Sequence, residues 1–252
     1  MSFPDDRGAF EAEKRENCLA LGADAAMFRA SIDAILASDK YKYSYLWSFL
    51  GVPIIQLPAD VMALQEVVWQ TKPDVIIETG IARGGSLIFF SAMQRLIGKG
   101  KTVGVDVDIR PHNRDSIEKH PMADRISLIE GSSVAPEIVE QVKEQIPAGS
   151  TTMVVLDSDH SYDHVLAELN AYAPLVSPGQ YLIVADTLLG YLRNTETPIT
   201  RSKVWLPGDE PLAAVRKFLE TNTNFEQDEV ANGKLILSAS PGGFLRRRTN
   251  IA

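Results

Sequence analysis

The chain has 252 residues and a formal net charge of −8, with 33 acidic and 25 basic side chains. This negative charge argues against a nucleic-acid or anionic-membrane partner. The sequence has no apolar run of the ~18 residues that a membrane span needs. Its N-terminus is polar, unlike a signal peptide, and its single Cys18 excludes an intramolecular disulfide,. We therefore expect a cytoplasmic protein that can bury a large core.

The first part of the chain predicts a helical extension over residues 1–57. Apolar side chains recur at helical spacing up to about residue 38, and an aromatic-rich segment follows at residues 41–53,. We interpret this segment first as core packing and second as a lid or one wall of a substrate pocket. The extension is also a candidate contact in a homo-oligomer. Residues 58–252 form the second predicted unit, which opens with a helix from Pro58 to Gln70, capped by Asp60.

A strand, a glycine turn and a helix follow one another between residues 74 and 93. Residues 75–77 predict a buried strand and residues 87–93 an apolar helix,. This arrangement opens a doubly wound sheet, in which ligands bind beyond the carboxyl ends of the strands. The turn and the acid before it supply the candidate ligand-binding residues, Glu78, Gly80, Ala82, Gly84, Gly85 and Ser86.

The turn favours one nucleoside cofactor over another. The dinucleotide pattern G-x-G-x-x-G would need a glycine at position 82, where the chain has Ala82,. Glu78 would also repel a pyrophosphate, whereas an acid suits the cationic amino group of S-adenosylmethionine (SAM). The next strand, residues 101–108, carries Asp106, at the place where such folds grip ribose hydroxyls,. The alternative for Asp106 is an ordinary residue of the turn.

Two further strand ends predict a metal site. Strands at residues 152–156 and 181–185 are followed by Asp157 and Asp186, which should meet over one crevice,. Two adjacent carboxylates need a cation or a shared proton, and oxygen ligands favour Mg²⁺ or Mn²⁺. Either acid could instead cap the helix that follows. His160 is placed to act as a general base, whereas His164 is better explained by packing or support.

The most specific motifs are residues 73–80 with Gly84-Gly85-Ser86, residues 156–161, and Asp186-Thr187. With them, the chain resembles the cephalosporin hydroxylase/rhamnosyl O-methyltransferase family, over a match from about Gly51 to Arg247. The resemblance implies a Rossmann-like class I methyltransferase, an α/β fold with a mostly parallel sheet and a C-terminal antiparallel hairpin. It also implies methyl transfer from SAM to a hydroxyl of a sugar or antibiotic-like metabolite, with a divalent metal.

The resemblance also assigns roles to the candidate residues. Glu78 and the turn from Gly80 to Ser86 would hold the methionine end of SAM, and Asp106 its ribose. Gly131 and Ser132, after the strand at residues 125–130, would flank the adenine. Asp157 would serve both the cofactor and the metal.

One position departs from the family. Ala185 stands where the family often has Glu, so the third metal ligand is open between the Thr187 hydroxyl, Asp159 and water.

The C-terminal part predicts a substrate loop and a hairpin. Residues 188–211 form a long segment with little periodicity, typical of a lid or binding loop. A helix follows from Pro211, and Asn232-Gly233 predicts the turn of a hairpin with strands at residues 225–230 and 234–239,. The basic residues 246–248 are interpreted as a solvated tail.

Three rival functions stay open: an NAD(P)-dependent oxidoreductase, a non-haem iron hydroxylase using His160 and His164, and a SAM-binding protein without catalysis.

Overall fold

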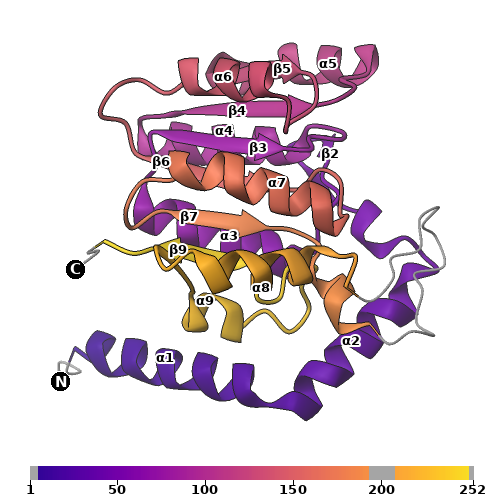
Figure 1. Ribbon diagram of the computed structural model, residues 1–252. Coiled ribbons are helices and arrows are strands. Elements are labelled where there is room, and N and C mark those ends of the chain that lie inside the picture. Colours follow the sequence, from indigo (N-terminus) through magenta and orange to yellow (C-terminus); the bar gives the residue numbers. More distant parts are fainter. Residues whose placement is uncertain (1–4, 193–207, 250–252) are drawn as a thin grey trace.

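The computed structural model describes residues 5–192 and 208–249, and its centre is a seven-stranded sheet with helices on both faces (Figure 1). The strands are ordered β5-β4-β3-β6-β7-β9-β8. They are β3 (Val75–Thr79), β4 (Lys101–Asp106), β5 (Ile126–Glu130), β6 (Thr152–Leu156), β7 (Tyr181–Val184), β8 (Phe225–Gln227) and β9 (Phe244–Arg247). The first five are parallel, and β9 runs antiparallel to both β7 and β8. The predicted doubly wound α/β fold is thereby confirmed.

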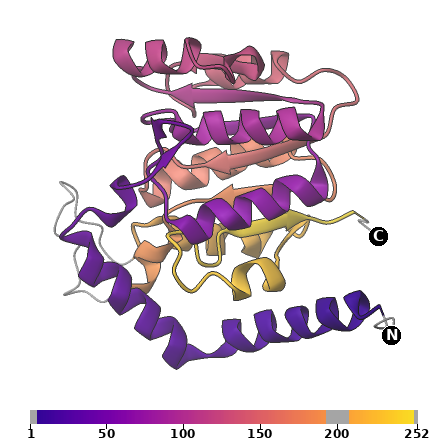
Figure 2. The ribbon, with the colours of Figure 1, turned by 180° about the vertical axis from the view of Figure 1, so that it is seen from behind.

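Helices cover both faces of the sheet because successive apolar side chains of a strand point to opposite faces,. In β3, Val75 and Ile77 face one core with α6, α7 and α8, while Ile76 faces a second core with α3 and α4. Figure 2, seen from behind, shows α3 and α4 on that second face. These helices are α3 (Pro58–Thr71), α4 (Gly85–Ile97), α6 (Pro136–Glu144), α7 (Tyr162–Tyr172) and α8 (Pro211–Thr221). None of the helices among the described residues combines the length and hydrophobicity needed to span a bilayer.

The remaining elements lie before and between these units. The extension contains α1 (Arg7–Ala23), α2 (Ala25–Asp39), the 3₁₀ turn η1 (Tyr43–Tyr45) and the short pair β1 (Ser48–Phe49) and β2 (Val52–Pro53). The others are α5 (Pro111–Glu118), η2 (Ala123–Arg125), η3 (Ala173–Leu175), η4 (Thr187–Tyr191) and α9 (Glu229–Gly233). Helix α1 runs along the outside of the molecule beside α9 (Figure 1).

The C-terminal hairpin exists, but the predicted turn is wrong. Asn232 and Gly233 end the short helix α9, because Asp228 caps it by accepting hydrogen bonds from the N–H groups of Val230 and Ala231. The second strand is β9, further along the chain, so two of the three residues of the supposed basic tail pair with the sheet. Gly233 instead lies against Gly22 of α1. A Cβ added to Gly22 would come within 2.7 Å of the Cα of Gly233.

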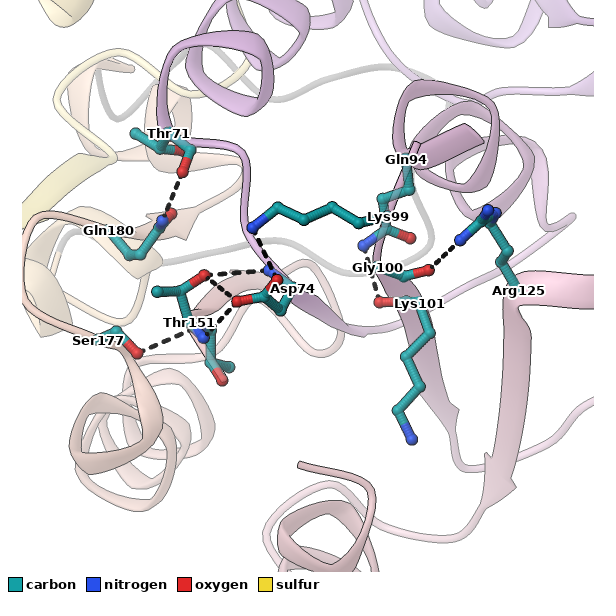
Figure 3. A network of polar contacts seen from close by, with 11 residues as sticks. Thr71, Asp74, Gln94, Lys99, Gly100, Lys101, Arg125, Thr151, Ser177 and Gln180 are labelled. Carbon is teal, nitrogen blue, oxygen red and sulfur yellow. Dashed lines mark hydrogen bonds and ion pairs between the residues drawn. The ribbon is translucent and has the colours of Figure 1, made fainter. Parts of the chain in front are cut away.

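The amino ends of the strands are joined by a polar network (Figure 3). Asp74, directly before β3, accepts hydrogen bonds from Thr151 N (2.9 Å), Thr151 Oγ1 (2.7 Å) and Lys99 Nζ (2.7 Å). These partners, with Lys99 first, lower the pKa of Asp74 to about 2. Gln94 donates to the carbonyl of Lys101 in the same region (2.8 Å). These contacts join loops, helix α4 and the start of β4 to one another, so we assign this end of the sheet a structural role.

Candidate active site

A cavity of about 640 Å³ opens at the opposite, carboxyl ends of the strands. That volume lies within the usual range for small-molecule sites. One wall comes from the strand ends and includes Gly80, Asp106, Asp157 and Asp186. The other wall comes from distant segments and includes the end of α2, Tyr43, Tyr45, Asp60 and Ser240. The cavity is therefore built between the predicted sheet edge and a cover that the strand pattern does not reveal.

The glycine turn after β3 packs tightly against the next strand end. Gly80 has φ +80°, and a Cβ on it would come within 2.0 Å of the carbonyl oxygen of Asp157. Gly84, the N-cap residue directly before α4, has φ +86°, a backbone conformation that strains any L side chain,. A Cβ on Gly85 would meet the Pro53 carbonyl oxygen at 2.4 Å. The glycines are thus required for the turn itself, as the sequence indicated.

Asp106 holds this turn from the neighbouring strand. Its Oδ2 accepts hydrogen bonds from Ile81 N (2.9 Å) and Ala82 N (3.2 Å), and its Oδ1 accepts one from Asp108 N (3.1 Å). Asp106 and Ala82 both line the cavity. Its contact with a ribose stays a prediction, and the structure adds a second task, shaping the turn.

Glu78 and Ser86 lie beneath the turn. Ser86 Oγ donates to Glu78 Oε2 (2.8 Å), and Glu78 is fully buried. Burial raises the pKa of Glu78 well above its ordinary value, and Asp157 and Asp106 add to the rise. Among the described residues, Oε1 of Glu78 has no hydrogen-bond partner. A buried carboxyl oxygen normally has a hydrogen-bond donor, so the free oxygen of Glu78 is suited to a donor that a ligand would bring, such as an ammonium group. Glu78 itself has no exposed surface in this structure.

The two strand-end aspartates meet as predicted, together with His160. Ligand atoms of Asp157, His160 and Asp186 all lie within 4.8 Å of one another. His160 Nε2 is 3.0 Å from Asp186 Oδ2. Two carboxylates and an imidazole form a donor set that fits a divalent cation. Thr187 points elsewhere, since its fully buried hydroxyl donates to the Pro241 carbonyl (2.8 Å), and Asp159 Oδ1 accepts from Ser161 N (2.7 Å).

A polar cluster that the sequence did not predict joins two loops to helix α7 beside the cavity. Glu168 Oε1 accepts hydrogen bonds from Ser133 Oγ (2.5 Å) and Ser158 Oγ (2.8 Å), and both hydroxyls also contact His164 Nε2. Its hydrogen bond with Glu168 raises the pKa of His164 above its ordinary value. Ser133 follows the predicted adenine pair Gly131-Ser132, and Ser158 follows Asp157. The spacing of four between His164 and Glu168 was the available sequence signal.

The aromatic segment forms a wall of the cavity. Tyr43 and Tyr45 line it and are 38% and 57% exposed. Tyr43 packs edge-on against Trp47, which is also exposed. The preferred interpretation as core packing is therefore wrong for these residues, and the alternative of one wall of a substrate pocket stays a prediction that their place on the cavity wall agrees with. The later substrate-loop prediction falls largely on residues 193–207, which lie outside the described residues.

Asp60 does not cap α3, because Leu57 occupies that position. Its carboxylate instead accepts hydrogen bonds from Ser238 Oγ and Ala239 N, the latter at 2.9 Å. Burial raises the pKa of Asp60 to about 7. Asp60 is also a cavity residue that the sequence did not place at the site.

Comparison with known proteins identifies relatives across most of the chain. The family model described as rhamnosyl O-methyltransferase/CmcI matches residues 41–248. A rhamnosyl O-methyltransferase of Mycobacterium tuberculosis is 30% identical over 239 residues, covering 88% of this chain and 89% of its own. The protein of the same name from Mycobacterium leprae is 30% identical over 223 residues, covering 84% and 91%.

Solved structures show the same fold at lower identity. A CmcI structure with Mg and SAM has a TM-score of 0.56 and 16% identity, covering 82% of this chain and 78% of its own. A CmcI apo-structure gives the same TM-score and the same coverage at 18% identity. These likenesses support the Rossmann-like arrangement described above.

Proposed function

The chain belongs to the rhamnosyl O-methyltransferase/CmcI family, and we propose that it transfers the methyl group of SAM to a hydroxyl of a sugar or another small natural-product acceptor. The observation that carries the proposal is the cavity itself. It joins the glycine turn and Asp106 on one side to Asp157, His160 and Asp186 on the other. A methyl donor and a hydroxyl held there would be close enough for in-line transfer.

The cofactor occupies the side formed by β3, β4 and β5. The turn from Gly80 to Ser86 holds the methionine end, and Glu78 beneath it offers its unsatisfied oxygen as a hydrogen-bond acceptor. Asp106 binds the ribose, and Gly131 with Ser132 flanks the adenine. Support comes from the close packing at Gly80, the unsatisfied oxygen of Glu78 and the position of Asp106 and Ser132 on the cavity wall.

Asp157 and Asp186 hold a divalent metal, Mg²⁺ or Mn²⁺. When bound, such an ion lowers the pKa of an acceptor hydroxyl and orients it. His160 would remove the hydroxyl proton through the ring nitrogen that does not face Asp186, while the acceptor oxygen bonds to the methyl carbon and the carbon–sulfur bond of SAM breaks. Asp186 orients the imidazole through the 3.0 Å contact. Because Thr187 is turned away, water is the favoured third ligand.

One observation supports a different task for His160. Its ligand atom lies within the same 4.8 Å group as those of the two aspartates, so it could occupy the place left by the family acid at Ala185. The alanine variant separates the two roles. Loss of a base lowers turnover with metal affinity retained, whereas loss of a ligand lowers metal affinity.

The rival functions fit the structure less well. An NAD(P)-dependent oxidoreductase would need a pyrophosphate over a turn that has Ala82 and a buried acid. An iron hydroxylase with two histidines would need His164 beside His160. His164 contacts Ser133 and Ser158 instead, and the three-residue group contains one histidine.

The acceptor screen is the test of the proposed reaction. The protein is treated with a chelator, Mg²⁺ or Mn²⁺ is restored, and SAM is supplied with a panel of glycosides and small hydroxylated metabolites. We expect mass spectrometry to find an acceptor that gains one methyl group, only with metal present. Full turnover in the metal-free protein would contradict the metal site. Tight SAM binding with no methylated product across the panel would favour a binding protein.

The extension, residues 1–57, is proposed to serve as a pocket wall and as a contact between copies of this chain in the cytoplasm. Its aromatic segment lines the cavity, and Phe10 on α1 is 62% exposed. Light scattering of the full chain tests the second part. A monomer at all concentrations would rule out the homo-oligomer.

A further inference from the structure

Asp60 occupies an unusual place for a carboxylate. It lies in the first turn of α3 and is only 4% exposed, yet it lines the cavity that contains Asp186. Its two oxygens accept hydrogen bonds from Ser238 Oγ and Ala239 N. Both donors belong to the segment 238–241, which precedes β9 and is about 180 positions further along the chain. Asp60 therefore fixes a loop that is remote in sequence.

That loop in turn holds the residues around Asp186. Leu188 N donates to the Ala239 carbonyl (3.0 Å), and Thr187 Oγ1 donates to the Pro241 carbonyl (2.8 Å). The two residues after Asp186 are thus tied to the same segment that Asp60 holds from the other side. A continuous series of hydrogen bonds leads from α3 to the metal-binding strand end.

Asp186 needs such support because its backbone is strained. Its φ is +53°, a left-handed conformation that is rare for a residue with a side chain,. A strained backbone at a functional site persists only where the surrounding structure holds it in place. The hydrogen bonds of Thr187 and Leu188 to the segment 238–241 supply that support directly after the strained residue.

We propose that Asp60 is a positioning residue for the metal site, which fixes segment 238–241 so that Asp186 keeps the strained backbone that turns its carboxylate toward Asp157. The inference rests on the metal site of the proposed function. It adds a residue from a helix that supplies no metal ligand. Residues that orient ligands without touching the metal typically change metal affinity by ~10–100-fold when they are replaced.

The test compares two acids of the same helix. Asp60→Ala removes the carboxylate, and Glu66→Gln is the matched control, since Glu66 also ties α3 to the C-terminal part through an ion pair with Lys234. Mn²⁺ affinity and SAM affinity are measured separately by calorimetry, alongside thermal melting. We expect Asp60→Ala to weaken Mn²⁺ binding ~10–100-fold, with SAM affinity nearly unchanged. Glu66→Gln should leave both affinities at the parental value. Asp60→Asn, which keeps one acceptor oxygen, should fall between.

Two outcomes overturn the inference: parental Mn²⁺ affinity in Asp60→Ala, or an equal loss of Mn²⁺ and SAM affinity, which would indicate general loosening. If Asp60→Ala does not fold, Ser238→Ala replaces it, and the same selective but smaller loss of Mn²⁺ affinity is required. A parent protein that binds no Mn²⁺ would overturn the metal site of the proposed function together with this inference. A parent that binds Mn²⁺ beside an unaffected Asp60→Ala would overturn the inference alone.

Discussion

The surroundings shift the pKa of a carboxyl group in opposite directions at the two ends of the same sheet. At the amino ends, Asp74 receives three hydrogen bonds, including one from the Lys99 ammonium, and its pKa falls to about 2 (Figure 3). At the carboxyl ends, Glu78 is buried with one oxygen unsatisfied among the described residues, and its pKa is raised. Neighbouring donors thus keep the carboxylate of Asp74 ionised, whereas burial favours the protonated form of Glu78 and leaves one of its oxygens without a donor among the described residues.

The backbone shows the same difference. Gly149, before β6, and Gly80, after β3, both have φ +80°. Around Gly149 there is open space, whereas Gly80 lies against the backbone of Asp157. Asp186, also at a carboxyl end, keeps a strained left-handed backbone. Substitutions at the carboxyl ends should therefore change ligand binding and turnover first, and those at the amino ends should change stability alone.

His160→Ala should give the largest effect. As the proposed general base, its loss should lower turnover by ~10²–10⁴-fold, with SAM and metal affinity and the thermal midpoint little changed. Steady-state kinetics, calorimetry and thermal melting measure the three properties. His112→Ala is the control, because this exposed histidine of α5 is not among the residues that line the cavity. A variant with near-parental turnover would remove His160 from catalysis, and a variant that loses metal first would make it a ligand.

Gly80→Ala should be the most destabilising of the two matched glycine changes. A left-handed alanine costs ~1–2 kcal/mol, and forcing a methyl group against backbone adds ~1–3 kcal/mol. Gly149→Ala has the same φ and no steric contact, so it should lose only the first amount. Chemical unfolding of both variants measures the difference, and SAM affinity should fall for Gly80→Ala alone. Equal losses would show that the turn can move away from Asp157.

The carboxyl end was also the more predictable part of the molecule. Strand ends in a parallel sheet meet at one edge, so Asp106, Asp157 and Asp186 could be brought together from local pattern and topology alone. His160 followed because it lies three residues after Asp157. The glycine turn was readable from the succession of strand, glycines and helix, whereas the close approach of Gly80 to the Asp157 backbone was not.

The cover of the cavity was not predictable in the same way. Asp60 looked like a helix cap, and only the distant segment 238–241 explains why it is buried. Asn232-Gly233 has the sequence of a tight turn, but the cap at Asp228 and the packing of Gly233 on α1 make it a helix end. Long-range contacts decide these positions, and a single sequence does not contain them.

Asp106→Ala should weaken SAM binding by ~1.5–3 kcal/mol, the worth of a hydrogen bond to a charged group. The change also removes the acceptor of the Ile81 and Ala82 N–H groups, so the turn itself should loosen. Asp108→Ala is a suitable control, since this exposed neighbour bonds to Arg110 at the surface. Calorimetry with SAM is the measurement, and unchanged affinity would exclude Asp106 from the cofactor site.

Asp74→Asn should have the smallest effect, and one on stability alone. The native pKa of about 2 lies below the ordinary 3.8, so the ionised form stabilises the fold. This stabilisation is fully present above the unfolded value and is lost as the pH falls through about 2. Because the side chain is 32% exposed, we expect a loss of only about 1 kcal/mol at neutral pH. Thermal melting across the acid range should show the parent and variant beginning to converge below the unfolded pKa of 3.8 and meeting below about 2, with SAM affinity identical,. A constant difference at every pH, or a change in SAM affinity, would contradict the separation of the two ends of the sheet.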